Sequence, residues 1–329
     1  MAKLIPFGAN STADQVLAGI DLTRRRIVVT ECDNEIGFET LKALAANGAH
    51  VIGLARTHSA ARSACVEAGR LAKPLACDWA DLTSVEAAAE SIWGLGESLD
   101  AVITHAKLAH LPTLHTRYGI ELQFFVNHIS RFLFVSRISD LVRSDTGRIV
   151  IVSSDASIKQ APRDGVMFDN LDGGQFYDPH VFLGQAKLAT ALYAKELSRR
   201  IASRRVSVNS VHAGVFEDIC LHGRGNAIRR LSHKIARLFT RSAAQNAGSL
   251  ALLAASPMVA GITGEYWTDC QIARGNPQLV DEGLAKRLWE VSEQIVSRLT
   301  GANAHRRYEQ GRLYQSRDSR QIPADRGQT

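Results

Sequence analysis

The chain has 329 residues, 45% of them hydrophobic and 22% charged, which is the profile of an ordinary globular protein with a sizeable buried core. Its net charge of +6 is not gathered on one structural element, so we exclude nucleic acid as a partner. The five cysteines are odd in number and have no C-x-x-C spacing, which excludes a disulfide framework and a zinc site. The sequence shows no apolar signal core and no apolar window of membrane length, which excludes an integral membrane segment. Together these features predict a cytoplasmic protein.

Strand and helix patterns alternate along the chain. Short, nearly continuous apolar runs predict strands at Arg26–Thr30, His50–Ala55, Leu71–Asp78, Leu99–Thr104, Gly147–Ser154, Val206–Val211 and Gly264–Thr268. Apolar residues at helical spacing predict helices at Ile36–Asn47, Leu82–Trp93, Gly119–Val142, Asp178–Arg200, Ala243–Ala255 and Glu282–Leu299. Because apolar strands need cover on both faces, the pattern predicts an α/β fold: a doubly wound parallel sheet, or Rossmann fold, in a single domain.

No internal repeat and no linker rich in proline or glycine divides the chain. We assign residues 1–22 to an N-terminal extension, 23–300 to the Rossmann-type domain and 301–329 to a polar, Arg-rich tail that is expected to be disordered. In such a sheet, ligands bind beyond the carboxyl ends of the strands, so the residues at those ends are the candidates for a functional site.

Five stretches in the expected order resemble the short-chain dehydrogenase/reductase superfamily, and most of all its branch of retinol dehydrogenases and WW-domain oxidoreductases. They are Glu121–Phe134, Gly147–Ser154, Gly184–Leu197, Gly264–Cys270 and Ala285–Glu293. The resemblance runs from about Ile20 to Val296. It implies an oxidoreductase that moves a hydride between NADP(H) and a lipophilic alcohol or carbonyl compound.

The resemblance also implies a catalytic set, of which one member has changed. Asn127, Ser154 and Lys187 match the asparagine, serine and lysine of the family. The position of the family's proton-transferring tyrosine holds Leu183, and leucine cannot give or take a proton. Tyr177 and His180 precede it, and the sequence leaves open whether either of them replaces the tyrosine.

Some positions of the family's cofactor site are kept in this sequence and others have changed. The resemblance assigns the following positions to the cofactor. They are Ile36, Gly37, Arg56, Asp78, Ala106, Lys187 and Val215. Arg56 is of the kind that contacts a 2′-phosphate, which favours NADP over NAD.

In the phosphate turn, Glu31 and Glu35 replace two glycines. Their charge opposes a pyrophosphate, so the absence of any cofactor is an open alternative. A further hypothesis is that Glu35 or Asp33 occupies the anion site at the start of the next helix.

Two functions therefore follow from the sequence. The first is a short-chain dehydrogenase/reductase-like oxidoreductase, impaired by Leu183 and the acidic turn. The alternative is a non-catalytic Rossmann scaffold that binds a small molecule or a protein partner. A different reaction in the same cleft, using Ser154, Lys187 or Cys32, has less support: no histidine base is evident for Ser154, and the acidic loop should raise the pKa of the Cys32 thiol. A homo-oligomer is compatible with the sequence.

Overall fold

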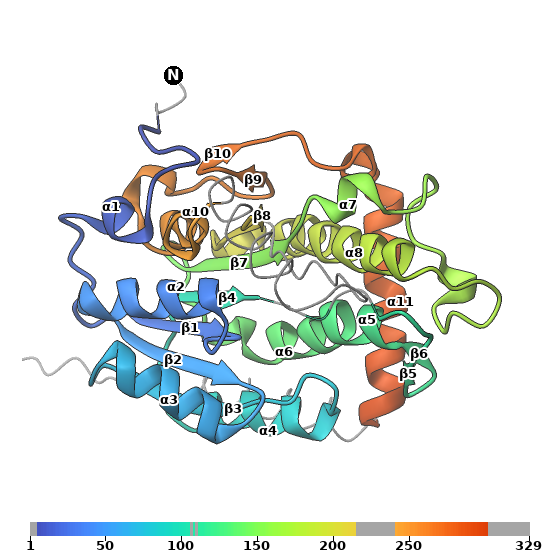
Figure 1. The fold of residues 1–329 in the computed structure, drawn as a ribbon, viewed down its shortest axis with the longest axis horizontal. Coiled ribbons are helices and arrows are strands. Elements are labelled where there is room, and N and C mark those ends of the chain that lie inside the picture. Colours follow the sequence, from blue (N-terminus) through green and yellow to red (C-terminus); the bar gives the residue numbers. More distant parts are fainter. Residues whose placement is uncertain (1–4, 106–107, 109–110, 215–240, 302–329) are drawn as a thin grey trace, which may run out of the picture.

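The computed structural model describes residues 5–105, 108, 111–214 and 241–301, and its centre is an eight-stranded sheet with the order β10-β9-β8-β7-β4-β1-β2-β3 (Figure 1). Its strands are β1 (Arg26–Thr30), β2 (His50–Ala55), β3 (Ala72–Ala76), β4 (Ala101–Thr104), β7 (Arg148–Ser153), β8 (Ser207–His212), β9 (Tyr266–Thr268) and β10 (Gln271–Ile272). All neighbouring strands are parallel except β10, which pairs antiparallel with β9. The predicted fold class is therefore confirmed.

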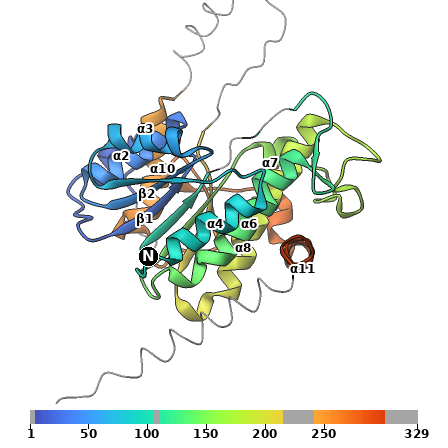
Figure 2. The same cartoon turned by 90° about the horizontal axis from the view of Figure 1, so that it is seen from below.

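Helices cover both faces of this sheet, as Figure 2 shows. The described α-helices are α1 (Ala13–Leu17), α2 (Glu35–Ala46), α3 (His58–Ala68), α4 (Leu82–Trp93), α5 (Leu122–Phe124), α6 (Ser130–Ile138), α7 (Ala156–Lys159), α8 (Pro179–Arg200), α10 (Ala243–Ala255) and α11 (Glu282–Thr300). One apolar core joins the sheet to α4, α6, α8 and α11, and a second joins the other face to α1, α2, α3 and α10. The two cores explain why the central strands read as continuous apolar runs.

Short polar side chains fix where the main helices begin. The residue before each helix has an extended backbone, and its side chain accepts a hydrogen bond from a backbone N–H of the first turn. These N-cap residues are Asn34, Thr57, Asp81, Asp178, Ser242 and Asp281. Caps of this kind satisfy N–H groups that the helix itself cannot pair.

The predicted long helix Gly119–Val142 is wrong at its start and interrupted within. Its first residues form the small hairpin of β5 (Thr116–Arg117) and β6 (Ile120–Glu121), in which Gly119 has φ +75. A π-helical turn, Phe125–Ile129, then joins α5 to α6. Short 3₁₀ turns occupy Ser139–Leu141, Phe168–Asn170, Ala202–Arg204, Pro257–Val259 and Pro277–Val280.

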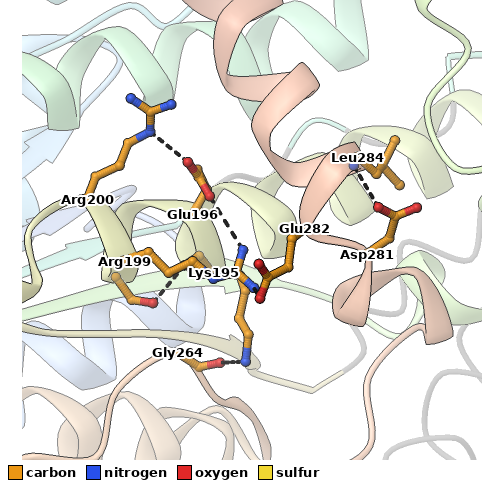
Figure 3. A network of polar contacts seen from close by, with 9 residues as sticks. Lys195, Glu196, Arg199, Arg200, Gly264, Asp281, Glu282 and Leu284 are labelled. Carbon is orange, nitrogen blue, oxygen red and sulfur yellow. Dashed lines mark hydrogen bonds and ion pairs between the residues drawn. The ribbon is translucent and has the colours of Figure 1, made fainter.

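A polar network fastens the end of α8 to α11 and to the segment before β9 (Figure 3). Glu196 pairs with Arg200 at 2.8 Å, and Arg199 reaches Glu282 of α11 at 2.8 Å. Lys195 donates to the Gly264 carbonyl oxygen at 2.8 Å. The Arg200 guanidinium also lies 4.3 Å from the ring centre of Trp289 on α11. Together these contacts hold α11 against α8.

The two ends of the chain differ in how much of them the structure describes. At the N-terminal end, α1 packs on α10 and buries Val16 and Leu17. At the C-terminal end, all of the predicted tail except Gly301 lies outside the described residues. Within the described ranges, no helix is both long and apolar enough to cross a membrane.

Candidate functional site

The candidate site lies beyond the carboxyl ends of β1, β4 and β7, where the direction of strand progression reverses (Figure 1). β1 is followed outward by β2 and β3, whereas β4 lies on its other side and is followed by β7 and β8. Ligands of such sheets bind in the crevice at this reversal. Thr30 ties the two halves together, because its Oγ1 accepts from the His105 backbone N–H at 2.7 Å and donates to the His105 carbonyl oxygen at 3.0 Å.

The turn after β1 keeps a glycine-like backbone at a residue that is not glycine. Glu31 has φ +53, in the left-handed region that strains a side chain by about 1–2 kcal/mol. Gly37 lies against the same turn, and a Cβ at Gly37 would overlap the Glu31 carbonyl oxygen. Gly37 is therefore required by the packing of the turn, whatever the turn binds.

The first turn of α2 is capped by a neutral side chain. Asn34 Oδ1 accepts from the Gly37 N–H at 2.7 Å, and Asn34 Nδ2 donates to His105 Nδ1 at 3.1 Å. Asp33 and Glu35 are exposed on either side. The hypothesis that Asp33 or Glu35 occupies the anion site of this helix is therefore wrong, because Asn34 holds the N-cap position and takes the amide that either acid would have used.

Glu31 instead forms a partly buried ion pair with a residue of α6. Arg131 Nη2 lies 2.7 Å from Glu31 Oε1, and the exposed fractions of the two side chains are 2% and 16%. The Arg131 guanidinium carbon also lies 3.3 Å from the ring centre of Trp79, which follows β3. Arg131 thus reaches from α6 across Trp79 to the phosphate turn and fixes the Glu31 side chain there.

The guanidinium is only partly satisfied by these contacts. Arg131 Nε and Nη1 are buried and have no hydrogen-bond partner. Burial lowers the pKa of Arg131, and the Glu31 charge opposes that shift. Arginine nonetheless keeps its charge in proteins, so a buried cation with unpaired donors lies in the cleft.

Two of the predicted catalytic residues lie near this cation. Burial and the Arg131 charge lower the pKa of Lys187, on α8, to about 8, while Glu31 raises it. Asn127 lies in the π-helical turn, four residues before Arg131; its Nδ2 donates to the Leu108 carbonyl oxygen at 2.8 Å, and its buried Oδ1 has no partner. π-Helical turns are common at functional sites. The structure therefore places Lys187 within the electrostatic influence of the Glu31–Arg131 pair, and Asn127 in the turn that leads into the helix of Arg131.

The third predicted residue, Ser154, follows β7 and is half buried. Its carbonyl oxygen accepts from the Ser157 N–H at 3.0 Å and from Ser157 Oγ at 2.6 Å, which starts the short helix α7. The preceding Ser153 Oγ donates to the Lys187 carbonyl oxygen at 2.7 Å. This bond fixes the end of β7 against the part of α8 that carries Lys187.

Leu183 lies one turn before Lys187 on α8 and is 5% exposed. Residues four apart on a helix share a face, so the Leu183 side chain lies on the same face as Lys187. The next residue, Gly184, packs so closely that a Cβ there would overlap backbone atoms of Gln160. This packing fixes the register of α8 in the cleft.

Neither alternative proton donor is placed like the residue it would replace. Tyr177 donates its hydroxyl to the Leu111 carbonyl oxygen at 2.6 Å, and burial and the Glu121 charge raise its pKa to about 12. His180 is exposed at the start of α8, where its backbone N–H donates to Asp178 Oδ1 at 2.8 Å. Both contacts belong to the loop and cap that start α8.

The remaining cofactor positions are spread over the same edge of the sheet. Arg56 is exposed at the end of β2, and Ile36 is buried in α2. Asp78 follows β3 and accepts from the Ala80 N–H at 3.0 Å. Asp81, not Asp78, caps α4. Ala106 and Val215 lie outside the described residues.

The cysteines in this region do not form an accessible nucleophile. Cys32 and Cys65 are both buried, and their sulfur atoms lie on either side of the point where a Cβ of Gly53 would be. A hydrogen bond with Cys65, together with burial, raises the pKa of Cys32, with smaller contributions from Asp33 and Glu31. The predicted direction of this shift is confirmed, although its main cause is a neighbouring thiol and not the acidic loop.

Sequence reasoning missed Arg131 and Trp79, the residues that fix Glu31. A signal for Arg131 existed, because S-R-F-L-F places a charge directly before an apolar run, four residues after Asn127. No local signal could have identified its partner, since Glu31 lies 100 positions away in the sequence. The hydrogen bond between Asn34 and His105 was missed for the same reason.

The family resemblance implies a dinucleotide cofactor, and the chemistry of the residues present shows how well such a cofactor fits. Gly37, Arg56, Asp78 and Lys187 are the described positions, besides Ile36, that the resemblance assigns to such a cofactor. A pyrophosphate, however, approaches the turn after β1 closely only if no side chain intervenes. Here that turn carries the Glu31 carboxylate, held in place by Arg131. The phosphate turn therefore does not fit the pyrophosphate.

Comparison with known proteins gives consistent matches along the chain. Residues 25–166 match the profile of the family described as short chain dehydrogenase. The WW domain-containing oxidoreductase of Homo sapiens is 31% identical over 310 residues, covering 91% of this chain and 74% of that protein. Retinol dehydrogenase 14 of Mus musculus is 30% identical over 295 residues, covering 83% and 86%. A crystal structure of an uncharacterised protein from Mycobacterium paratuberculosis shares the fold, with a TM-score of 0.69, 21% identity and coverage of 87% and 97%.

Proposed function

Because this chain belongs to the short-chain dehydrogenase/reductase family of NAD(P)-dependent oxidoreductases, we propose that it is a member that keeps the Rossmann scaffold and a ligand cleft but does not transfer hydride. The cleft then binds a small organic molecule. A protein partner that contacts the surface around the cleft meets it either filled or empty. The observation that carries this proposal is the buried aliphatic side chain of Leu183, one turn before Lys187.

A carbonyl or alcohol substrate must gain or lose a proton when hydride moves, and a positioned acid–base group accelerates that step by about 10²–10⁴-fold. Leu183 offers no such group. Tyr177 already donates its hydroxyl to a backbone carbonyl, and its raised pKa opposes ionisation near neutral pH. His180 is exposed whereas Leu183 is buried, so replacing the missing donor would require the start of α8 to move.

The phosphate turn supports the same proposal independently. Glu31 occupies a position that needs glycine for a close approach of phosphate, and Arg131 neutralises it from within the protein. Such a pair lets the fold carry an acidic turn without a bound nucleotide. Two separate changes, one in the proton donor and one in the phosphate turn, both favour a binding protein.

The second candidate is an NADP(H)-dependent oxidoreductase acting on a lipophilic alcohol or carbonyl compound. It is supported by Asn127, Ser154 and Lys187, which match the catalytic asparagine, serine and lysine of the family, and by Arg56, which is exposed after β2 and is of the kind that contacts a 2′-phosphate. The retinol dehydrogenase and WW-domain relatives support this candidate through their family chemistry alone. NAD in place of NADP has less support, because Arg56 has no role toward an unphosphorylated ribose.

The two candidates are separated by titrating the wild-type protein with NADPH and with NADH while following its melting temperature and its absorbance with aldehyde and ketone panels. A ligand that binds the folded state raises the melting temperature by mass action. The proposal expects no shift at millimolar nucleotide and no oxidation of NADPH. A clear shift accompanied by turnover would establish the second candidate instead.

A further inference from the structure

We propose that Arg131 and Lys187 form the polar end of a binding site for a small organic carboxylate with an apolar tail. This inference rests on the proposed function, because it names the ligand class of a cleft that does not transfer hydride. It is carried by the juxtaposition of a buried, partly unsatisfied guanidinium, a second buried cation and a single carboxylate.

The guanidinium is the strongest sign of a missing partner. Arg131 is 2% exposed, and Nε and Nη1 have no hydrogen-bond partner, although Nη2 is paired with Glu31. Buried polar groups in proteins are nearly always paired, because desolvation without a replacement bond is unfavourable. An acceptor that enters the cleft would satisfy these donors.

The charges define what kind of acceptor fits. Arg131 and Lys187 are both buried. The Arg131 charge lowers the pKa of Lys187, and Glu31 is the negative group that acts on both residues. With both cations protonated, this cluster carries one excess positive charge. A monoanion neutralises it, whereas a dianionic phosphate would leave an excess negative charge in a buried site.

Glu31 itself shows that a carboxylate is accepted there. Its Oε1 lies 2.7 Å from Arg131 Nη2, the ordinary length of a charge-assisted hydrogen bond. Glu31 is also the more exposed member, at 16%, so the pair is open on the side of the phosphate turn. We therefore regard Glu31 as a tethered carboxylate that a free carboxylate joins or displaces.

The surroundings explain the apolar tail. Leu183 precedes Lys187 by one turn on the same face of α8, so an aliphatic wall stands beside the ammonium group where the family has a hydroxyl. A ligand with an acid group at Arg131 and a hydrocarbon chain along Leu183 matches this charge and this aliphatic side chain.

The test uses isothermal titration calorimetry of the full-length chain with sodium hexanoate, hexan-1-ol and inorganic phosphate at constant ionic strength. We expect hexanoate to bind at least about tenfold more tightly than hexanol, because one charge-assisted hydrogen bond is worth that much or more. Phosphate is expected to bind no more tightly than hexanol. Equal affinity for hexanoate and hexanol would overturn the proposal.

Three variants locate the effect. Arg131→Met should weaken hexanoate binding by about tenfold or more, whereas Glu31→Gln should tighten it, because the tethered competitor is lost and the cluster becomes more positive. Arg200→Met is the matched control: Arg200 also stacks on a tryptophan and pairs with a glutamate, but on the far end of α8 (Figure 3). It should leave hexanoate binding unchanged.

The outcomes remain decisive even if one variant folds poorly. Should Arg131→Met fail to fold, Glu31→Gln still decides, since unchanged or weaker hexanoate binding in that variant contradicts the proposal. Absence of hexanoate binding in both the wild type and Glu31→Gln removes the carboxylate site but leaves the non-catalytic function standing. NADPH-dependent turnover, measured on the same protein, removes the proposed function and is detected separately.

Discussion

Arg131 Nη2 and Glu31 Oε1 lie 2.7 Å apart, although the two residues are separated by 100 positions in the sequence. The pair joins α6 to the turn after β1. It places a carboxylate at the position where the short-chain dehydrogenase fold needs a bare backbone for a pyrophosphate. The acidic turn is therefore compensated within the protein, and this pairing leads to the first prediction.

Glu31→Gly should destabilise the protein, even though it relieves a strained backbone. Removing one member of a buried ion pair costs about 3–5 kcal/mol, and relief of the left-handed strain at Glu31 returns about 1–2 kcal/mol. We expect a net loss of about 2 kcal/mol in the free energy of unfolding, measured with urea. The double variant Glu31→Gly/Arg131→Met should recover most of that loss. A double variant less stable than Glu31→Gly would show that the two residues are not coupled.

Leu183→Tyr alone should not create turnover, because the phosphate turn would still exclude the dinucleotide. The combined variant Glu31→Gly/Glu35→Gly/Leu183→Tyr should oxidise NADPH with aldehydes at a rate about 10²-fold or more above the same variant with Leu183→Phe. Phenylalanine is the control, since it has the size of tyrosine without the hydroxyl. Equal rates for the tyrosine and phenylalanine versions would refute the role assigned to position 183.

The pKa of Lys187 should respond in opposite directions to its two charged neighbours. The positive charge of Arg131 helps to lower this pKa to about 8, and Glu31 raises it. Arg131→Met should therefore raise the pKa of Lys187, and Glu31→Gln should lower it further. An NMR titration of the lysine side chain would measure both shifts. A pKa that stays the same in both variants would mean that the three charges do not share one cleft.

A buried histidine should make the protein sensitive to acid. His128 Nε2 contacts Ser292 Oγ at 2.8 Å between the π-helical turn and α11, and burial lowers its pKa to about 3. The unfolded chain takes up this proton near its ordinary pKa of 6.5, whereas the folded protein does not. Stability therefore falls as pH drops from about 6.5 toward 3, by about 1.4 kcal/mol per pH unit.

His128→Gln tests this prediction, because glutamine can still bond to Ser292 but does not titrate. Unfolding with urea at several values between pH 7 and pH 4 should give a steeper loss for the wild type than for the variant. The difference between the two slopes isolates His128 from the carboxylates that titrate in the same range. Parallel curves would contradict a neutral, buried His128.

Gly37 should be needed for stability and not only for a ligand. A Cβ at this position would overlap the Glu31 carbonyl oxygen, so Gly37→Ala should destabilise the protein by about 1–3 kcal/mol. Gly94→Ala is a suitable control, because the added Cβ would only reach ordinary contact distance. Thermal unfolding without ligand compares the two, and equal melting temperatures would show that the turn has room for a side chain.

The central strands could be predicted from the sequence because burial on both faces leaves them apolar, as in β1, β2 and β7. Helix α3 was missed although Thr57 and Gly69 mark its ends, since its composition is too polar for the apolar period to show. The long helix Gly119–Val142 was overextended, because the short strand Ile120–Glu121 after the hairpin turn is buried like the helix that follows it. Periodicity reports burial, and it does not distinguish such a buried strand from the first turn of a helix.

The same limit applies to the site. Asn127, Ser154 and Lys187 could be proposed as site residues because each keeps its local motif. Arg131 and Trp79 could not, because their importance comes from contacts with Glu31 and with each other across the fold. Those contacts decide whether another residue of the protein balances the negative charge of Glu31 in the turn. The sequence alone does not predict this pairing.

The measurement that tests the central claim most directly is a calorimetric titration of the wild-type protein with NADPH, followed by an assay of NADPH oxidation in the same sample. The account predicts no binding tighter than the millimolar range and no oxidation with any aldehyde or ketone, because Glu31 holds the turn and Leu183 offers no proton. Micromolar binding together with turnover would contradict it.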